Sequence, residues 1–410
     1  MLKSQKRELT QPVAADNRTP MKSIAIIGAG PAGLMAADRL SAAGHRVDIY
    51  DRMPSVARKF LMAGRGGLNL THSEPFERFV SRYGKAAPRL RPALEAFPPK
   101  ALRDWADALG AATFVGTSGR VFPKAMKASP LLRAWLARLA DQGVTLHARH
   151  DWLGWDDGQL VFAAPVGKLY LTPDATILAL GGASWPRLGA DGGWAPLLAD
   201  RGVTVAPFQP ANAGFTTAWS ALFTDRFAGQ PVKTIALRFG GREVKGELMI
   251  TRRGLEGGAI YAISATLRDA ISRHGHADLV IDLHPDLNAG QVASKLGRAS
   301  VKDSLSNRLR KALNLSPAAI GLVHETGATD IKAVTVRLTG MEGLERAISS
   351  AGGIAFDALT PDFELKALPG VYAVGEMLDW EAPTGGYLLQ ACFSTAAAAA
   401  DRINAPLPPR

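Results

Sequence analysis

The chain has 410 residues, 47% hydrophobic and 21% charged, which is ordinary for a globular protein and long enough for two or three structural units. Its formal net charge of +11 can indicate an anionic substrate or nucleic acid. Because the basic residues are scattered along the chain, we attribute the charge mainly to solubility and phosphate neutralisation. We therefore disfavour nucleic acid as a partner. The single cysteine excludes an internal disulfide, and no apolar run approaches the ~18 residues that span a bilayer, so no membrane partner is expected.

Residues 1–21 are polar and lack the apolar core of a secretory signal. We therefore expect a disordered N-terminal extension and, by default, a cytoplasmic protein.

The first structured unit is a strand, a glycine-rich turn and a helix that begin near residue 22. The apolar run Ile24–Ile27 predicts a buried strand, and apolar residues at helical spacing follow the turn. Of the three glycines between them, Gly28 suits the tight turn, Gly30 allows the backbone to approach a pyrophosphate, and Gly33 allows the helix to pack against the strand.

A second predicted strand, Val47–Tyr50, ends at Asp51. An acidic residue about 20 positions after the glycines is placed to hold a ribose hydroxyl. The alternative is a glycine-rich turn that binds nothing. Because the strand, the helix and the acid all accompany the glycines, we interpret this unit as a dinucleotide site.

Residues 53–72 read as a loop rich in glycine and basic residues. We predict that this loop lies along the pyrophosphate and ribityl chain of a cofactor; the alternative is a mobile surface loop. The features that favour the cofactor are Gly64, Gly66, Gly67 and Asn69 beside Arg52, Arg58, Lys59 and Arg65.

The middle of the chain changes character near residue 207. Before it, a buried strand over 175–180 ends in Gly181-Gly182, a second junction where backbone can touch a cofactor. After it, residues 234–250 predict a β-hairpin and 259–273 a single helix. We therefore predict a β-rich domain over 207–345, with a helical subdomain at about 259–325, inserted between two parts of a nucleotide-binding domain at 22–206 and 346–410.

The last segment returns to nucleotide-domain character. A short strand precedes Gly375-Glu376, and Thr384–Tyr387 runs glycines into a helix. A helix N-terminus beside a flavin ring stabilises the negative charge of the reduced flavin. Two glycine-to-helix junctions at opposite ends of one chain therefore favour FAD over a nicotinamide as the resident cofactor. We place Glu376 next to the ribityl chain or a bound water, although a surface acid that caps its turn is an alternative.

No catalytic acid or base can be assigned from the sequence. His324 and Glu325 are adjacent, and on a strand they would point to opposite faces, so we favour a structural role for them. The eight histidines show no metal-ligand spacing, so no metal is expected.

Several longer segments carry a family resemblance. They are KFLMAGRGGLNLTH, GRVFPKAMKAS, LALGGASWPRLGADGG, GELMITRRGLEGGAI and the C-terminal stretch from AGGIAF to STAAAA. Through them the chain resembles the YhiN-like (BaiN-like) family of bacterial NAD(P)/FAD-dependent oxidoreductases from about Lys22 to its end.

The resemblance implies an α/β fold in which a Rossmann-like FAD-binding domain, split in sequence, carries an inserted β-barrel-like domain with a helical subdomain. It also implies that the strand near Trp152 meets the adenine. By the motifs and the resemblance together, the residues expected to contact FAD are Gly28, Ala29, Gly30, Pro31, Ala32, Gly33, Asp51, Arg52, Lys59, Gly64, Gly66, Gly67, Asn69, Trp152, Gly181, Gly182, Gly375, Glu376, Gly386, Tyr387 and Leu388.

Two loops depart from the family pattern. Leu68 stands where many members have a cysteine, and Thr251–Gly258 replaces a Thr-His-x-Gly-x-Ser-Gly-Pro loop, with arginine in place of the histidine. If that second loop borders the substrate, a substrate inferred from another member is unsafe.

The function expected is that of an FAD-dependent oxidoreductase which transfers a hydride to or from a small organic substrate, with NAD(P)H as a transient reductant. Family activities imply reduction of a conjugated alkene or oxidation of an amine. Two alternatives stay open: a flavoprotein that modifies RNA, and a flavin-binding protein without turnover.

Overall fold

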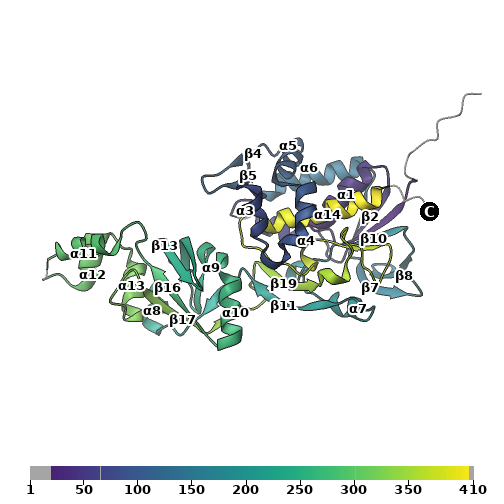
Figure 1. Ribbon diagram of the computed structural model, residues 1–410. Coiled ribbons are helices and arrows are strands. Elements are labelled where there is room, and N and C mark those ends of the chain that lie inside the picture. The colour runs from purple at the N-terminus through teal and green to yellow at the C-terminus, as the bar shows by residue number, and fades with distance from the viewer. Residues whose placement is uncertain (1–19, 65, 301, 406–410) are drawn as a thin grey trace, which may run out of the picture.

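The computed structural model describes residues 20–64, 66–300 and 302–405. The predicted disordered extension therefore lies almost entirely outside the described residues. Figure 1 shows two lobes side by side, one that contains both ends of the described chain and one formed by its middle.

The first lobe is built on a five-stranded parallel sheet with strand order β20-β10-β1-β2-β6. β1 lies at its centre, and the chain adds β2 and β6 on one side and β10 and β20 on the other. The strands are β1 Ser23–Ile27, β2 Arg46–Asp51, β6 Thr145–Ala148, β10 Ala175–Leu178 and β20 Val371–Ala373. The apolar run at the centre explains the fold, because a parallel strand covered on both faces must be apolar throughout.

A layer of helices covers this sheet, and the first and last long helices of the lobe pack against each other within it. In Figure 1 the C-terminal helix α14 lies beside α1 although most of the chain separates them. The helices of this layer are α1 Pro31–Ala42, α3 Phe76–Ser81, α4 Ala87–Ala96, α5 Pro99–Ala108, α6 Ala128–Asp141 and α14 Tyr387–Asn404. Small residues on α14, such as Ala396 and Ala400, are fully buried and allow the close approach.

Two small antiparallel sheets complete the lobe. One has the order β7-β8-β9 and packs onto the main core through Trp152 and Phe162; the other has the order β3-β5-β4. Their strands are β7 Asp151–Asp156, β8 Gln159–Ala164, β9 Gly167–Leu171, β3 Thr71–His72, β4 Thr113–Val115 and β5 Arg120–Pro123.

The segment 53–72 is not a continuous loop as predicted, because it contains the short helix α2, Arg58–Ala63. Phe60 explains the difference: its ring is buried and meets the edge of Trp135 on α6. This tertiary contact stabilises a turn of helix that local glycine content argued against.

Two strands connect the lobes. β11, Val205–Ala211, and β19, Ser349–Ile354, form a two-stranded antiparallel sheet, and every residue of β19 is buried. The short helix α7, Ala195–Ala199, packs on β11.

The second lobe has its own hydrophobic core and a seven-stranded antiparallel sheet in the order β17-β16-β13-β14-β15-β12-β18. The two edge strands, β17 and β18, are separated in sequence only by Thr339. Its strands are β12 Phe215–Thr216, β13 Pro231–Phe239, β14 Arg242–Ile250, β15 Gly254–Glu256, β16 Ala277–Asp282, β17 Val334–Leu338 and β18 Gly340–Met341. The β13–β14 hairpin confirms the pairing predicted for 234–250.

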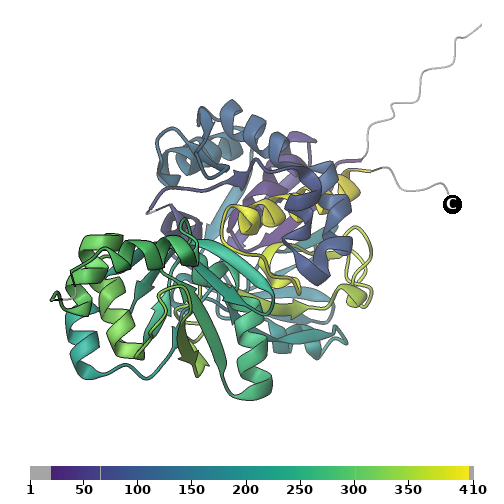
Figure 2. The same cartoon turned by 60° about the vertical axis from the view of Figure 1, so that its left-hand side comes forward.

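Six described helices belong to this lobe. Figure 2, in which this lobe comes toward the viewer, shows helices at its periphery. They are α8 Ala221–Phe227, α9 Gly258–Ala262, α10 Ser264–His274, α11 Ala289–Gly297, α12 Leu305–Leu313 and α13 Pro317–Thr326. The single helix predicted over 259–273 is wrong, because the chain breaks at buried Ile263 between α9 and α10. His324 and Glu325 lie on α13 rather than on a strand. Glu325 accepts hydrogen bonds from the backbone and hydroxyl of Ser220, and His324 forms a hydrogen bond with Ser306, which supports a structural role for both residues.

Candidate functional site

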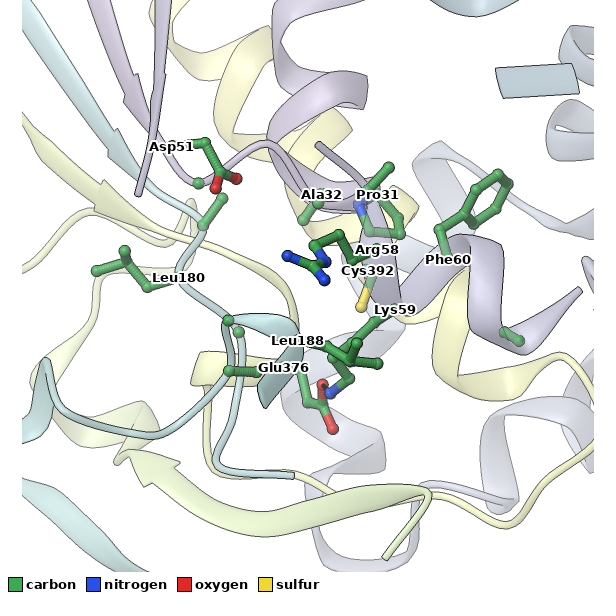
Figure 3. Close-up of a pocket in the computed structure, with 18 of the residues that line it drawn as sticks. Pro31, Ala32, Asp51, Arg58, Lys59, Phe60, Leu180, Leu188, Glu376 and Cys392 are labelled. Carbon is green, nitrogen blue, oxygen red and sulfur yellow. Dashed lines mark hydrogen bonds and ion pairs between the residues drawn. The ribbon is translucent and has the colours of Figure 1, made fainter. Parts of the chain in front are cut away.

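A cavity of about 520 Å³ lies at the carboxyl ends of β1, β2, β10 and β20. Figure 3 shows that side chains from the beginning and the end of the chain point into it. Its size is within the range of small-molecule sites. It also lies where the strand order reverses around β1, which is the place where open α/β sheets bind their ligands.

Most of the residues predicted to contact a cofactor line this cavity. These are Gly28, Gly30, Pro31, Ala32, Asp51, Arg52, Lys59, Gly67, Asn69, Trp152, Gly181, Glu376, Gly386 and Leu388. The predicted residues that do not line it are Ala29, Gly33, Gly64, Gly66, Gly182, Gly375 and Tyr387. Among the described residues, none between 212 and 345 lines the cavity, so in this arrangement the second lobe stands apart from it.

The three glycines of the first turn have different surroundings. A Cβ on Gly28 would lie 2.3 Å from the carbonyl oxygen of Ala179, and one on Gly33 would lie 1.9 Å from the carbonyl oxygen of Gly28. Both positions therefore require glycine for packing. A Cβ on Gly30 would meet nothing within 4 Å, although Gly30 lines the cavity. This open space at the N-terminus of α1 is a cradle into which a phosphate can approach.

The Asp51 carboxylate is held by the same turn. Its Oδ2 accepts a hydrogen bond from the N–H of Ala29 (2.8 Å), and its Oδ1 accepts one from the N–H of Met53 (2.8 Å). Burial raises the pKa of Asp51 above its ordinary value, and these two N–H groups oppose the rise. A carboxylate has about four acceptor positions, so each oxygen keeps one for a ribose hydroxyl.

Cationic side chains approach the middle of the cavity from α2 and the loop before it. Arg52 is fixed by Asp191 (2.8 Å) and by the carbonyl of Gly189 (2.9 Å). Arg58 points into the cavity in Figure 3, and no hydrogen bond or ion pair joins its side chain to another residue of the described chain. An unpaired guanidinium beside the N-terminus of α1 is suited to a pyrophosphate.

Lys59 and Glu376 form an ion pair in the wall of the cavity. Nζ of Lys59 lies 2.7 Å from Oε2 of Glu376 and also donates to the hydroxyl of Ser184 (2.9 Å). The other oxygen of Glu376 accepts the N–H of Ser350 (3.1 Å). Both carboxylate oxygens of Glu376 are thus paired with protein groups. That Glu376 contacts the ribityl chain stays a prediction.

The N-terminus of α14 forms the far end of the cavity. Gly386, the N-cap, has a φ of 96°, and a Cβ there would lie 2.5 Å from the backbone of Thr71, so this close approach requires glycine. The side chain of Tyr387 turns away: its hydroxyl donates to Glu74 and its ring stacks on His72. Leu388 and Leu389 contribute apolar surface to the cavity instead.

Two buried polar atoms test whether the cavity suits an extended dinucleotide. Oδ1 of Asn69 and Nε1 of Trp152 are buried without a hydrogen-bond partner, and both residues line the cavity. Buried polar groups are normally paired, so each of these two atoms is available to a bound molecule in the cavity. Ribityl hydroxyls or a flavin N–H fit the acceptor of Asn69, and an adenine nitrogen fits the donor of Trp152. The residues present therefore fit FAD.

The predicted contacts did not include several residues of this cavity. Arg58 belongs to the basic loop predicted to lie along the cofactor, but the residues predicted to contact FAD include its neighbour Lys59 and not Arg58. Arg120 and Cys392 gave no signal, because a strand arginine and a helix cysteine are usually structural. Burial raises the pKa of the Cys392 thiol to about 12, so it is held protonated. Among the described residues no group of His, Cys, Asp and Glu is arranged to hold a metal ion.

The split parallel sheet, the glycine turn at α1 and the second glycine turn at α14 define a Rossmann-type FAD-binding oxidoreductase. The chain belongs to the HI0933-like family: the family described as "HI0933-like protein Rossmann domain" matches residues 22–402. This confirms the family resemblance and the class of enzyme, an FAD-dependent oxidoreductase. No helix in the described ranges is long and apolar enough to cross a membrane.

Two relatives with different names cover nearly the whole chain. This chain is 26% identical over 403 residues to the "Ribosomal RNA dihydrouridine synthase" of Escherichia coli, and the match covers 93% of this chain and 97% of the relative. It is 27% identical over 407 residues to the "3-dehydro-bile acid delta(4,6)-reductase" of Clostridium scindens, and the match covers 92% of this chain and 97% of the relative.

Solved flavoenzymes share the fold. The open conformation of a flavocytochrome c3 fumarate reductase matches with a TM-score of 0.53 at 16% identity, covering 95% of this chain and 79% of that one. A 3-ketosteroid-delta4-(5alpha)-dehydrogenase from Rhodococcus jostii matches with a TM-score of 0.52 at 13% identity, covering 95% and 99%. At these identities the likeness concerns the fold alone.

Proposed function

We propose that this protein uses FAD to reduce a carbon–carbon double bond conjugated to a carbonyl group in a small organic substrate. The observation that carries the proposal is a cavity that extends between two helix N-termini, α1 at Gly30 and α14 at Gly386. The names of the two relatives support it. A delta(4,6)-reductase acts on an alkene, and dihydrouridine differs from uridine by two hydrogens across an alkene that is conjugated to a carbonyl.

When bound, FAD supplies the centre that carries the hydride. In this proposal Gly30, Arg58 and the N-terminus of α1 bind the pyrophosphate, and Asp51 binds the adenosine ribose. The N-terminus of α14 stabilises negative charge at the reacting end, because its free N–H groups point there. Reduced nicotinamide is the proposed electron donor. The chain has no second G-x-G-x-x-G turn, so the donor binds transiently.

The site residues named from the sequence remain part of this proposal, as does the barrel-like character of the second lobe. The second lobe is proposed to complete the substrate site from the side that the cavity leaves open. Its two edge strands, consecutive in sequence, support a sheet that curves toward closure.

The test uses the flavin absorbance as an indicator. The purified protein should release FAD on heating and should be bleached by NADH or NADPH without oxygen. 2-Cyclohexen-1-one, a Δ4-3-ketosteroid and uridine are then added separately, with cyclohexene as the matched control that lacks the carbonyl. We expect at least one conjugated compound to restore the oxidised spectrum and cyclohexene not to do so. Bleaching by amines together with no response to any conjugated carbonyl would contradict the proposal, and absence of all redox change would indicate a flavin-binding protein without turnover.

A second candidate, reduction of a base in RNA, is favoured by the surface beside the cavity. On β4, Phe114 and Val115 are 42% and 43% exposed, and on the following segment Met126 is 38% exposed between the exposed lysines Lys124 and Lys127. Aromatic rings beside cations are typical of surfaces that bind single-stranded nucleic acid. This candidate predicts RNA binding that weakens steeply with salt. No retention of a ribosomal RNA fragment at low salt would exclude it.

A further inference from the structure

Arg120 is a cationic residue of the cavity that the FAD contacts described above leave unused. It begins β5 and lines the cavity together with Gly67, Asn69 and Gly386, at the end formed by α14. This is the end opposite Asp51, so Arg120 is not placed to neutralise the pyrophosphate beside α1. Its side chain is partly buried.

The guanidinium of Arg120 has no carboxylate partner. No hydrogen bond, ion pair or ring contact joins its side chain to another residue of the ranges that the structure describes. The nearby acid Glu74 is already bound by Arg82 through two hydrogen bonds of 3.0 and 2.7 Å and by the Tyr387 hydroxyl. A partly buried arginine without a counter-ion is available to an oxygen atom of a ligand.

The backbone holds Arg120 firmly in this position. β5 lies between β3 and β4, with Arg120 opposite His72 and Val121 opposite Thr71. The buried side chains of Val121 and Pro123 fix one face of the strand, so that Arg120 and Phe122 occupy the other. Thr71 in turn touches Gly386 at the N-cap of α14. The strand therefore ties Arg120 to the reacting end of the cavity.

The neighbouring histidine is committed to other partners. Nδ1 of His72 accepts the N–H of Glu74 (3.1 Å), so its Nε2 carries the proton and donates to the carbonyl of Ser118 (3.0 Å). Burial, the largest cause, lowers the pKa of His72, and the charge of Arg120 contributes in the same direction. His72 is thus a neutral support and not a competing cation.

We propose that Arg120 binds the carbonyl or carboxylate oxygen that activates the double bond of the substrate. This inference rests on the proposed function. In the reaction a hydride from reduced FAD forms the new C–H bond at the β-carbon, the π electrons of the alkene move toward the carbonyl, and the carbonyl oxygen becomes an enolate oxygen. A proton from water then adds to the α-carbon, and the carbonyl is restored. Arg120 stabilises the oxygen as its negative charge develops.

The test compares Arg120→Met and Arg120→Lys with Lys85→Met, which removes the charge of an exposed lysine that does not line the cavity. FAD content and flavin reduction potential are measured first, and then the Kd of 4-chlorophenolate, read from the perturbed flavin spectrum. For Arg120→Met we expect unchanged FAD content and potential, with phenolate binding weakened by about 10- to 100-fold, as for the loss of one hydrogen bond to a charged group. Arg120→Lys should recover part of that loss, and Lys85→Met should bind as the parent protein does.

Three results would overturn the inference. They are loss of FAD in Arg120→Met, a lowered reduction potential with unchanged phenolate binding, and equal phenolate affinity in all variants. The first two assign Arg120 to the flavin and leave the proposed function standing. The conjugated-carbonyl assay on the parent protein decides the proposed function separately, because it does not depend on Arg120. If that assay succeeds, kcat/KM should fall in Arg120→Met by a factor similar to the loss of phenolate affinity.

Discussion

Lys59 and Glu376 meet across the cavity wall, with Nζ and Oε2 2.7 Å apart, although 317 positions separate them in sequence. One lies on α2 and the other directly after β20, so the pair joins the first and last parts of the nucleotide-binding lobe. Because Lys59 also donates to the hydroxyl of Ser184 and Glu376 also accepts the N–H of Ser350, the pair belongs to a network and is not an isolated contact.

Replacement of either partner should destabilise the lobe. The side chains of Lys59 and Glu376 are 25% and 15% exposed, so each of Lys59→Met and Glu376→Gln should lower the free energy of unfolding by about 1–3 kcal/mol, less than for a fully buried pair. The double variant should lose less than the sum, because no unpaired charge remains. Urea unfolding of all four proteins measures this, and additivity within about 0.5 kcal/mol would show that the pair is not coupled.

Gly30→Leu should abolish FAD retention while the fold persists. A Cβ at this position meets no protein atom within 4 Å, and Gly30 lines the cavity, so the leucine side chain would extend into the cradle. The φ of −83° at Gly30 is also accessible to leucine. Flavin absorbance of the purified variant and its circular dichroism report the two properties. Gly297→Leu, at an open and exposed position on α11, is the matched control and should keep its FAD. A yellow Gly30→Leu protein would contradict the site.

Asp51→Ala should weaken both FAD binding and the turn itself. The N–H groups of Ala29 and Met53 lose their acceptor, and an unpaired buried N–H costs about 1–3 kcal/mol. We therefore expect a lower melting temperature even without FAD, together with an increased Kd for FAD. Calorimetry with and without added FAD separates the two effects. If the apo protein melts at the parent temperature, the carboxylate does not hold the turn.

Cys392 should report the cavity through its reaction with iodoacetamide. With a pKa of about 12, the thiol is ionised in only about one molecule in ten thousand at pH 8, against about a quarter for an ordinary thiol. The alkylation rate of the apo protein should be slow and should rise about tenfold per pH unit between pH 7 and 10. Since this is the single cysteine of the chain, mass spectrometry reads it directly. A rate that levels off near pH 9 would contradict the raised pKa, and bound FAD should slow the reaction at every pH.

The sequence by itself determined the cofactor and the family. Gly28, Gly30 and Gly33 are readable because strand, turn and helix are local, and the physical needs of a tight turn and a phosphate approach leave few residue types open. The same holds for the glycines before α14. The local sequence also predicted the β13–β14 hairpin, whose turn residues Gly240 and Gly241 both have positive φ.

The tertiary structure alone decided which side chains share the cavity. The helix α2 is stabilised by the contact of Phe60 with Trp135 on α6. The break between α9 and α10 occurs at Ile263, which is buried, and the local sequence periodicity does not predict it. Lys59 and Glu376 are 317 positions apart in sequence, and Arg120 is held opposite His72 by the pairing of β5 with β3, so both depend on segments that only the fold brings together. Hydrogen bonds and ion pairs act over a few ångströms, so partners of this kind become visible only when the fold places them in contact.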